Sequence, residues 1–170
     1  ASLKNTSTKF LAVRYGNVIN SRGSLIPKFK EIGESENITF FPVTDERMTR
    51  FFMTLDQSVT LIDTAILCGK SGDTWIPHIE SFRIVDIAHY FSERYKKPIS
   101  VVGIRPGEKI HECLINQSEI YRTIKHEING VIYYVIKPCY TQEINHDVQS
   151  EYTSENISSI SIKDLFDSII

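Results

Sequence analysis

Short apolar runs along the chain alternate with segments in which apolar residues recur every three or four positions. The runs are typical of buried strands, and the wider spacing is typical of helices with one buried face. The predicted strands are Lys9–Val13, Asn37–Val43, Thr49–Thr54, Thr74–Ile79, Pro98–Ile104 and Gly130–Pro138. The predicted helices are Leu25–Ile32, Asp56–Cys68, a helix capped by Ser81 that runs to Tyr95, and Ser161–Ile170. This alternation predicts an α/β fold.

The helical spacing also predicts which side chains face the core. The expected inward residues are Ile26, Phe29 and Ile32 in the first helix, Val59, Ile62, Ala65 and Ile66 in the second, and Ile84, Ile87, Ala88 and Phe91 in the third. Two segments are less regular. Lys109–Ile115 is interpreted as a short helix or an extended turn, and Thr141–Glu151 as a polar loop.

The first predicted strand, Lys9–Val13, is apolar throughout and ends in Arg14-Tyr15-Gly16-Asn17. Such a run is typical of a buried strand in a parallel sheet, which needs neighbours on both sides. Only 13 residues precede Arg14, and they contain neither a glycine-rich phosphate loop nor a tyrosine. We therefore expect the chain to be truncated, with neighbouring elements of this sheet upstream of residue 1.

The composition narrows the function classes. A chain of 170 residues that is 41% hydrophobic can bury one ordinary core together with a smaller lobe. A net charge of −2 argues against a general nucleic-acid binder. No apolar run is long enough for a membrane span, and the start lacks the apolar region of a signal peptide. Cys68, Cys113 and Cys139 show no disulfide or zinc spacing, which favours free thiols and a cytoplasmic location.

Three arginines lie among turn formers or at strand ends, where they could bind an anion. Arginine suits phosphate because its planar guanidinium donates two parallel hydrogen bonds. Arg22 lies in a Ser-Arg-Gly-Ser turn, Arg50 lies between apolar neighbours, and Arg105 precedes Pro106 and Gly107. Glu108 then supplies a pair of acceptor oxygens suited to the two hydroxyls of a ribose.

Structural interpretations compete with each of these assignments. Any one arginine can instead form a surface ion pair, Arg14 is better explained as structural, and Asn17 is either a ligand contact or a turn residue. The histidines show no metal-ligand spacing, so no metal site is predicted. A nucleophilic pairing of His111 with Cys113 is rejected, because residues two apart on a helix do not face each other.

Several motifs together resemble a known family. They are Arg14-Tyr15-Gly16-Asn17-Val18, Ser21-Arg22-Gly23-Ser24, Pro27, Thr44-Asp45-Glu46-Arg47-Met48-Thr49-Arg50-Phe51, Ile84-Val85-Asp86 and Gly103-Ile104-Arg105-Pro106-Gly107-Glu108-Lys109-Ile110-His111-Glu112. Their order and spacing resemble the C-terminal part of extended short-chain dehydrogenase/reductases, specifically the UDP-N-acetylglucosamine 4,6-dehydratases of polysaccharide and flagellin-glycan biosynthesis. The resemblance runs from about Phe10 to Glu119, with weaker matches at Tyr134–Pro138 and Tyr152–Ser154. His78, Glu80 and Phe82 depart from the family pattern, which has lysine, proline and methionine there.

The resemblance implies a role for each candidate residue. Asn17 would contact the sugar-diphosphate, Arg50 and Arg105 would clamp the diphosphate, and Glu108 would bind the uridine ribose. The sugar and diphosphate region would be lined by Ser21, Arg22 and Ser24, and the uracil would be bordered by Thr39 and Phe41. The nicotinamide of NAD(P) would lie near Tyr15 and Gly16.

The same resemblance implies a domain organisation and a reaction. Residues 1–20 would be a remnant of the Rossmann domain, 21–140 the UDP-sugar-binding region with returning Rossmann elements, and 141–170 a tail with a closing helix. In the family reaction NAD(P)⁺ takes hydride from sugar C4, water is lost across C5 and C6, and hydride returns to C6, with inversion at C5 in some members.

No catalytic residue of that reaction maps onto this chain, because the family's tyrosine–lysine pair and its acid/base residues precede the matching region. We therefore expect no turnover by the chain alone, and a homo-oligomer for the full-length protein. Two alternatives stay open. One is a nucleotide-sugar 4-epimerase or C5-inverting variant of the same fold, and the other is a catalytically empty UDP-sugar-binding module.

Overall fold

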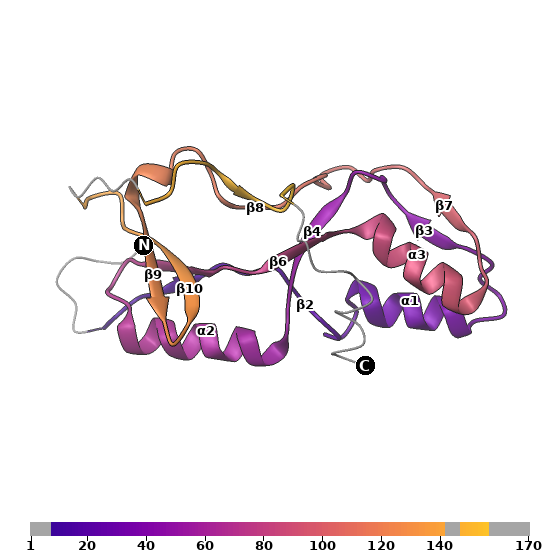
Figure 1. Cartoon of the computed structure of the whole chain (residues 1–170), viewed down its shortest axis with the longest axis horizontal. Coiled ribbons are helices and arrows are strands. Elements are labelled where there is room, and N and C mark those ends of the chain that lie inside the picture. The colour runs from indigo at the N-terminus through magenta and orange to yellow at the C-terminus, as the bar shows by residue number, and fades with distance from the viewer. Residues whose placement is uncertain (1–7, 142–146, 157–170) are drawn as a thin grey trace. The chain divides into compact units, whose positions relative to one another are not determined.

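The computed structural model describes residues 8–141 and 147–156, which form two compact units (Figure 1). The first unit contains the described residues 8–16, 53–79, 113–141 and 147–153. The second contains 17–52, 80–112 and 154–156. The chain thus contributes several separate segments to each unit. The functional division of the sequence into residues 1–20, 21–140 and 141–170 stays a prediction.

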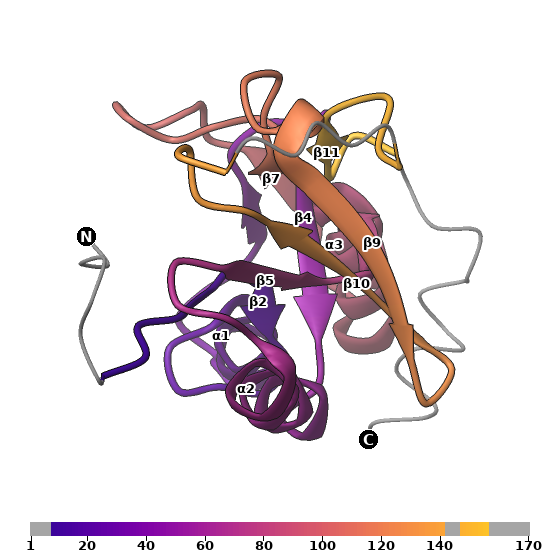
Figure 2. The same cartoon turned by 90° about the vertical axis from the view of Figure 1, so that its left-hand side faces the viewer.

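The first unit is built on a four-stranded sheet with the order β1-β5-β10-β9. β1 (Ala12–Val13) runs parallel to β5 (Thr74–Pro77), and β10 (Val131–Ile136) runs antiparallel to both β5 and β9 (Thr123–Ile128). Figure 2 shows β5, β10 and β9 side by side above α2 (Leu55–Cys68). The parallel pair confirms the predicted α/β class.

The β9–β10 hairpin was missed by the hydrophobic pattern, which identified only its second strand. Its two turn residues, Asn129 and Gly130, both have positive φ, at 53° and 77°. An Asn-Gly pair between two strands is a strong signal for a tight hairpin, because both residues tolerate that conformation. β9 alternates exposed and half-buried residues and lacks a continuous apolar run, so this turn was the available clue.

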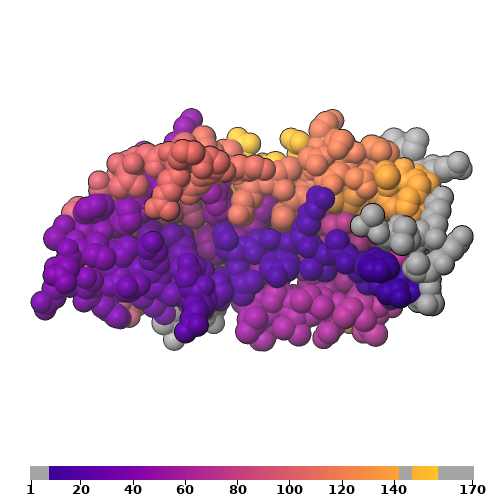
Figure 3. Space-filling view, turned by 180° about the vertical axis from the view of Figure 1, so that it is seen from behind, coloured from indigo at the N-terminus to yellow at the C-terminus, as the bar shows by residue number. Residues whose placement is uncertain are grey.

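α2 packs on the sheet through a different face from the one predicted. Its buried residues are Ser58, Leu61 and Ala65, of which only Ala65 was expected. The remaining expected residues, Val59, Ile62 and Ile66, are 49%, 41% and 55% exposed. The helix has apolar residues on two faces, so their spacing alone does not decide which face is buried. Part of the α2 surface, in magenta, is visible in the space-filling view (Figure 3).

Arg14 follows β1 and is held by a second segment of the same unit. Its two terminal nitrogens each lie 2.8 Å from a carboxylate oxygen of Glu119, and one also donates to the Leu114 carbonyl at 3.1 Å. These bonds raise the pKa of Arg14 despite its partial burial. Arg14 therefore makes the structural contacts that its position at a strand end predicts.

His78 follows β5 and lies in an aromatic cluster of the first unit. Its ring stacks on Tyr152 with centroids 5.8 Å apart, and Nδ1 lies 3.4 Å from the Tyr134 hydroxyl. The Tyr152 hydroxyl in turn accepts from the Ile79 amide and donates to the Ile79 carbonyl, both at 2.9 Å. His78, where the family pattern has lysine, thus takes part in a contact that anchors β11 (Tyr152–Thr153).

The second unit combines two small sheets with two helices. β2 (Asn17–Val18), β4 (Thr49–Met53) and β6 (Glu80–Arg83) form one sheet, and β3 (Phe41–Val43) pairs in parallel with β7 (Ile99–Val101). Figure 1 shows α1 (Leu25–Glu34) and α3 (Ile84–Tyr95) beside β3 and β7.

An aromatic core joins these elements. The Phe29 ring lies 5.4 Å from Phe41 and 5.7 Å from Phe91, centroid to centroid, and all three side chains are buried. Such offset and edge-on contacts add to the free energy of burial. The predicted inward faces of α1 and α3 are confirmed, because all of their expected residues are buried.

The start of α3 differs from the prediction. Ser81 is not its N-cap; Arg83 is, and residues 80–83 form β6, antiparallel to β4. The Ser81 hydroxyl is buried and donates to the Asn156 carbonyl at 2.7 Å, so it serves a long-range contact instead. Pairing with β4 keeps this segment extended until Ile84.

Other boundaries also changed. β1, β3 and β7 are shorter than their predicted strands, because each pairs with a neighbour over only part of the predicted run. Within Lys109–Ile115 the helix alternative is wrong, since Cys113–Ile115 is strand β8, paired with β11. A single-turn helix, η1, covers Ile120–Arg122. The predicted Ser161–Ile170 helix lies outside the described residues. No helix among the residues described could span a membrane.

Candidate functional site

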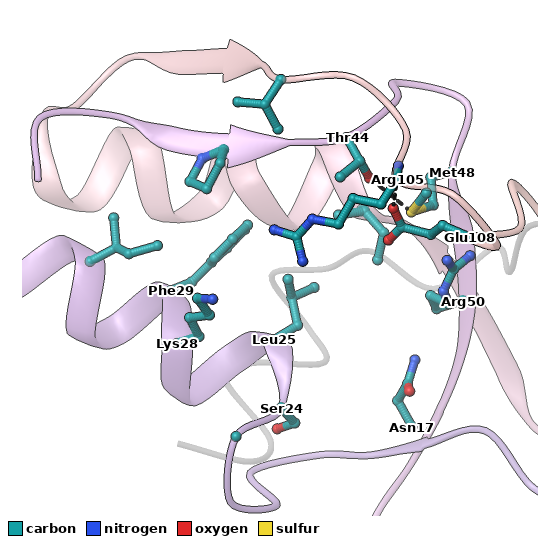
Figure 4. A pocket seen from close by; sticks show the side chains of 15 residues that line it. Asn17, Ser24, Leu25, Lys28, Phe29, Thr44, Met48, Arg50, Arg105 and Glu108 are labelled. Carbon is teal, nitrogen blue, oxygen red and sulfur yellow. Dashed lines mark hydrogen bonds between the residues drawn. The ribbon is translucent and has the colours of Figure 1, made fainter.

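A cavity of about 360 Å³ lies in the second unit, between α1, the ends of β3 and β4, and the loop after β7 (Figure 4). Its lining residues are Asn17, Gly23, Ser24, Leu25, Lys28, Phe29, Ile32, Pro42, Thr44, Met48, Arg50, Ile84, Val102, Arg105 and Glu108. Three of them are cationic, namely Lys28, Arg50 and Arg105, and only Glu108 is acidic. The cavity therefore combines an apolar lining with a positive balance of charge, which suits an anionic ligand that carries an apolar ring.

The loop after β7 presents Arg105 and Glu108 to the cavity. Its glycines at 103 and 107 have φ values of 89° and 84°, in the left-handed region where a side chain is strained. The Glu108 amide donates to the Arg105 carbonyl at 3.0 Å, and the Arg105 amide lies 3.3 Å from the Glu108 carboxylate. The turn Arg-Pro-Gly-Glu thus fixes both side chains on one side of the loop.

Arg105 extends across the cavity toward α1 (Figure 4). Within the part of the chain that the structure describes, its guanidinium makes no hydrogen bond or ion pair. An unpaired guanidinium over a cavity is a strong candidate for a phosphate contact, because it can donate two parallel bonds to the oxygens.

Arg50 is different, because its guanidinium already has partners. Its nitrogens donate to the carbonyls of Thr49 at 2.7 Å, Ile110 at 3.0 Å and Lys109 at 2.8 Å. Its Nε also lies 3.6 Å from the Glu112 carboxylate, and the side chain is 15% exposed. Arg50 therefore fastens the segment after Glu108 to β4 while it also lines the cavity.

Glu112 is the acidic partner at this fastening point. Burial raises the pKa of its carboxyl group, and the Phe51 amide and Arg50 oppose that rise. The Phe51 amide donates to the carboxylate at 3.0 Å. Glu112 thus connects β4 to the end of the loop and is a structural part of the site.

The start of α1 forms the opposite side of the cavity. Ser24 is the N-cap, but its buried hydroxyl has no hydrogen-bond partner among the described residues. A buried unpartnered hydroxyl is costly, and a helix N-terminus favours negative charge. Figure 4 shows the Asn17 amide from β2 pointing toward Arg50. Lys28, one turn into α1, also lines the cavity and was not among the predicted residues.

The structure brings five of the predicted substrate residues together: Asn17, Ser24, Arg50, Arg105 and Glu108 line one cavity. Ser21 and Arg22 are exposed in the turn before α1 and do not line it. Tyr15 and Gly16 belong to the first unit, where Tyr15 is 43% exposed after the end of β1.

Thr39 and Phe41 also do not line the cavity. Thr39 is exposed, and Phe41 is fully buried in the aromatic core. Alternate residues of a strand face opposite sides, so Pro42 takes the cavity side that the sequence interpretation gave to its neighbour.

No cluster of side chains that could hold a metal ion occurs within residues 8–141 and 147–156. The cavity therefore offers amides, hydroxyls, cations and one carboxylate for ligand binding.

The chain belongs to the family of polysaccharide biosynthesis proteins, whose sequence profile matches residues 1–134. It is 39% identical over 134 residues to "UDP-N-acetylglucosamine 4,6-dehydratase (inverting)" of Campylobacter jejuni, covering 79% of this chain and 38% of that protein. It is 31% identical over 180 residues to "UDP-glucose 4-epimerase" of Rickettsia prowazekii, covering 97% of this chain and 50% of that protein.

Among solved structures, the X-ray structure of Pen from Bacillus thuringiensis is similar, with a TM-score of 0.79 and 29% identity over 95% of this chain and 48% of that one. The chain thus spans half or less of the length of these relatives. The fold is consistent with the C-terminal part of an extended short-chain dehydrogenase/reductase, as the sequence predicts.

Proposed function

We propose that this chain forms the UDP-sugar-binding part of a nucleotide-sugar 4,6-dehydratase in polysaccharide biosynthesis. The main support for the proposal is the Arg105 guanidinium, which has no partner within residues 8–141 and 147–156 and lies over a cavity lined also by Glu108 and the start of α1. The dehydratase name of the Campylobacter relative supports the choice of reaction.

Each lining residue has a chemically suitable part of the ligand. Arg105 binds the diphosphate, and the N-terminus of α1 with Ser24 and Lys28 adds donors and positive charge. Glu108 accepts hydrogen bonds from the ribose hydroxyls, and Asn17 contacts the sugar-diphosphate. The apolar lining residues, which include Leu25, Phe29, Pro42 and Val102, surround the uracil.

NAD(P) is the cofactor that this proposal requires. Tyr15 and Gly16 follow the carboxyl end of β1, a strand parallel to β5, and ligands of open α/β sheets bind at such ends. The position therefore fits a contact with the nicotinamide, while we propose that most of the cofactor site lies outside the described residues. When bound, NAD(P)⁺ accepts hydride from sugar C4. The residues of this chain hold the sugar by its nucleotide.

A 4-epimerase is the second candidate, because the Rickettsia epimerase aligns with 97% of this chain whereas the Campylobacter dehydratase aligns with 79%. Both reactions need the same diphosphate grip. Mass spectrometry of the product separates them, since dehydration loses one water from the sugar and epimerisation leaves the mass unchanged. The assay requires a longer protein, such as this chain fused to the amino-terminal half of the Campylobacter relative.

The same fusion tests whether the site is an empty binding module. UDP binding without turnover in the folded fusion would favour the empty module over the enzyme. The chain by itself is expected to show no NAD(P)-dependent dehydration. A cytoplasmic location and a homo-oligomeric full-length protein stay predictions.

Isothermal titration calorimetry tests the binding function directly. UDP and UDP-N-acetylglucosamine are expected to bind with similar affinity, and uridine more weakly because it lacks the diphosphate. Failure of the folded chain to bind UDP, or equal binding of UDP and uridine, would contradict the proposed diphosphate contact.

A further inference from the structure

Ser154 connects the cavity loop to a segment that lies 42 residues further along the chain. The Ser154 side chain is fully buried. Its hydroxyl accepts a hydrogen bond from the Glu112 amide at 2.8 Å, and the Ser154 amide donates to the Glu112 carbonyl at 2.9 Å. The two residues are thus joined by two bonds, one from each amide, of which one goes to a backbone carbonyl and the other to a side-chain hydroxyl.

The Ser154 hydroxyl also reaches β4. It lies 2.7 Å from the Thr49 hydroxyl and 3.2 Å from the Thr49 carbonyl. The Thr49 hydroxyl lies 2.8 Å from Nδ1 of His111, and the Thr49 amide donates to the Ile110 carbonyl at 3.0 Å. Residues 110, 111 and 112 are therefore all held by Thr49 or Ser154, two to four residues after Glu108, which lines the cavity.

The protons in this network can be placed without leaving a group unpaired. If His111 Nδ1 accepts from Thr49, the Ser154 hydroxyl donates to the Thr49 hydroxyl oxygen. If His111 Nδ1 donates, the Thr49 hydroxyl donates to Ser154 and the Ser154 hydroxyl turns to the Thr49 carbonyl. In both arrangements the Ser154 oxygen accepts the Glu112 amide, so loss of this oxygen leaves a buried N–H without a partner.

From these contacts we infer that Ser154 is a positioning residue for the ligand-binding loop. It does not line the cavity itself. It holds Glu112 and Thr49, while Arg50, next to Thr49, holds the carbonyls of Lys109 and Ile110. The loop that carries Arg105 and Glu108 is thereby anchored at its end. This role rests on the proposed UDP-sugar binding, and it assigns a function to a residue beyond the part that the family profile matches, residues 1–134.

The test compares Ser154→Ala with a matched control, Ser81→Ala. Ser81 is also a buried serine, and its hydroxyl bonds to the same segment through the Asn156 carbonyl at 2.7 Å, but it does not touch the loop. A second pair, Thr49→Val and Thr49→Ser, removes or keeps the hydroxyl at the other end of the network. All four variants are measured at a temperature where circular dichroism shows them folded.

Two readouts distinguish this inference from the proposed function. Amide hydrogen exchange at Glu108 and Glu112 reports loop order without any ligand, and calorimetry reports UDP affinity. For Ser154→Ala and Thr49→Val, exchange at these amides should become about 10- to 100-fold faster and the Kd for UDP about 5- to 50-fold larger. Ser81→Ala and Thr49→Ser should stay within about threefold of the wild type on both readouts, because each keeps the bonds to the loop.

Unchanged exchange in Ser154→Ala would overturn the inference, as would equal effects in Ser81→Ala, which would assign the change to general packing of the segment. Faster exchange with unchanged UDP affinity would also overturn it, because the loop would then not need this anchor for binding. If the wild type itself does not bind UDP, the proposed function fails, and exchange alone decides whether Ser154 orders the loop. Should Ser154→Ala fail to fold, the Thr49 pair decides the outcome.

Discussion

Arg50 and Arg105 both line the cavity, yet replacement of each by alanine should affect a different property, stability for Arg50 and ligand affinity for Arg105. The Arg50 guanidinium donates to three carbonyls at 2.7–3.0 Å, whereas the Arg105 guanidinium has no partner within the described residues. Arg50→Ala should therefore destabilise the fold. Arg105→Ala should change the free energy of unfolding by less than about 0.5 kcal/mol and weaken UDP binding by about 1–3 kcal/mol.

The magnitude for Arg50→Ala follows from its contacts. A hydrogen bond to a charged donor contributes about 1.5–3 kcal/mol when it is shielded from water. The bonds to Thr49 and Ile110 are partly buried, and the bond to Lys109 is exposed and counts for less. We expect a loss of about 2–4 kcal/mol in the free energy of unfolding. Arg50→Lys should fall between, because an ammonium group keeps the charge but cannot reach all three carbonyls.

Urea denaturation followed by circular dichroism measures these free energies, and calorimetry with UDP measures binding. An Arg50→Ala protein within about 0.5 kcal/mol of the wild type in free energy of unfolding would refute the structural role of Arg50. An Arg105→Ala protein that is destabilised as much as Arg50→Ala would refute the statement that Arg105 is free to serve a ligand.

Three further changes test other parts of the structure. Burial raises the pKa of Glu119, but the hydrogen bonds from Arg14 and the Asn116 amide and the charges of Arg14 and Arg122 together lower it below 4.5. The stabilisation by Glu119 should therefore be complete above pH 4.5 and lost as pH falls through the lower folded value. Urea titrations should show the gap between wild type and Glu119→Gln narrowing below that pH, and a gap that is constant with pH would contradict the ion pair. Gly33→Ala should lower the free energy of unfolding by about 1–3 kcal/mol, measured by thermal unfolding, because the new Cβ would lie 2.5 Å from the Tyr95 ring. Alanine favours helices over glycine, so a stabilised variant would show that the ring moves aside freely. Lys28→Ala should leave stability unchanged and weaken UDP binding by about 0.5–1.5 kcal/mol in calorimetry. The loss of affinity should be larger at low salt than at high salt, and an equal loss at both salt concentrations would argue against a charge contact.

Local chemistry in the sequence was sufficient to predict that Arg105 and Glu108 share one site. Arg105 and Glu108 were predicted because Pro106 and Gly107 fix the turn between them, and this turn depends on neighbours in sequence. The helices α1 and α3 were also predicted within a few residues, since each has one clear apolar face.

The features that the sequence did not predict depend on contacts between residues far apart in the chain. The spacing in α2 has apolar residues on two faces, so only the sheet beneath it determines that Leu61 is buried and Val59 is not. In β3, Phe41 faces the core and Pro42 faces the cavity. A strand of three residues is too short for its sequence pattern to show which residue takes which side. Ser154 was only part of a weak motif, because its partners lie 42 and 105 residues away.

We propose that the cavity of the second unit binds the nucleotide of a UDP-sugar. Titration of the ¹⁵N-labelled chain with UDP-N-acetylglucosamine, followed by amide chemical shifts, tests it most directly. The proposed site predicts saturable shifts at Asn17, at Ser24–Lys28 and at Gly103–Glu108, with small shifts in the β9–β10 hairpin. An absence of saturable shifts in the folded chain, or shifts confined to the first unit, would contradict it.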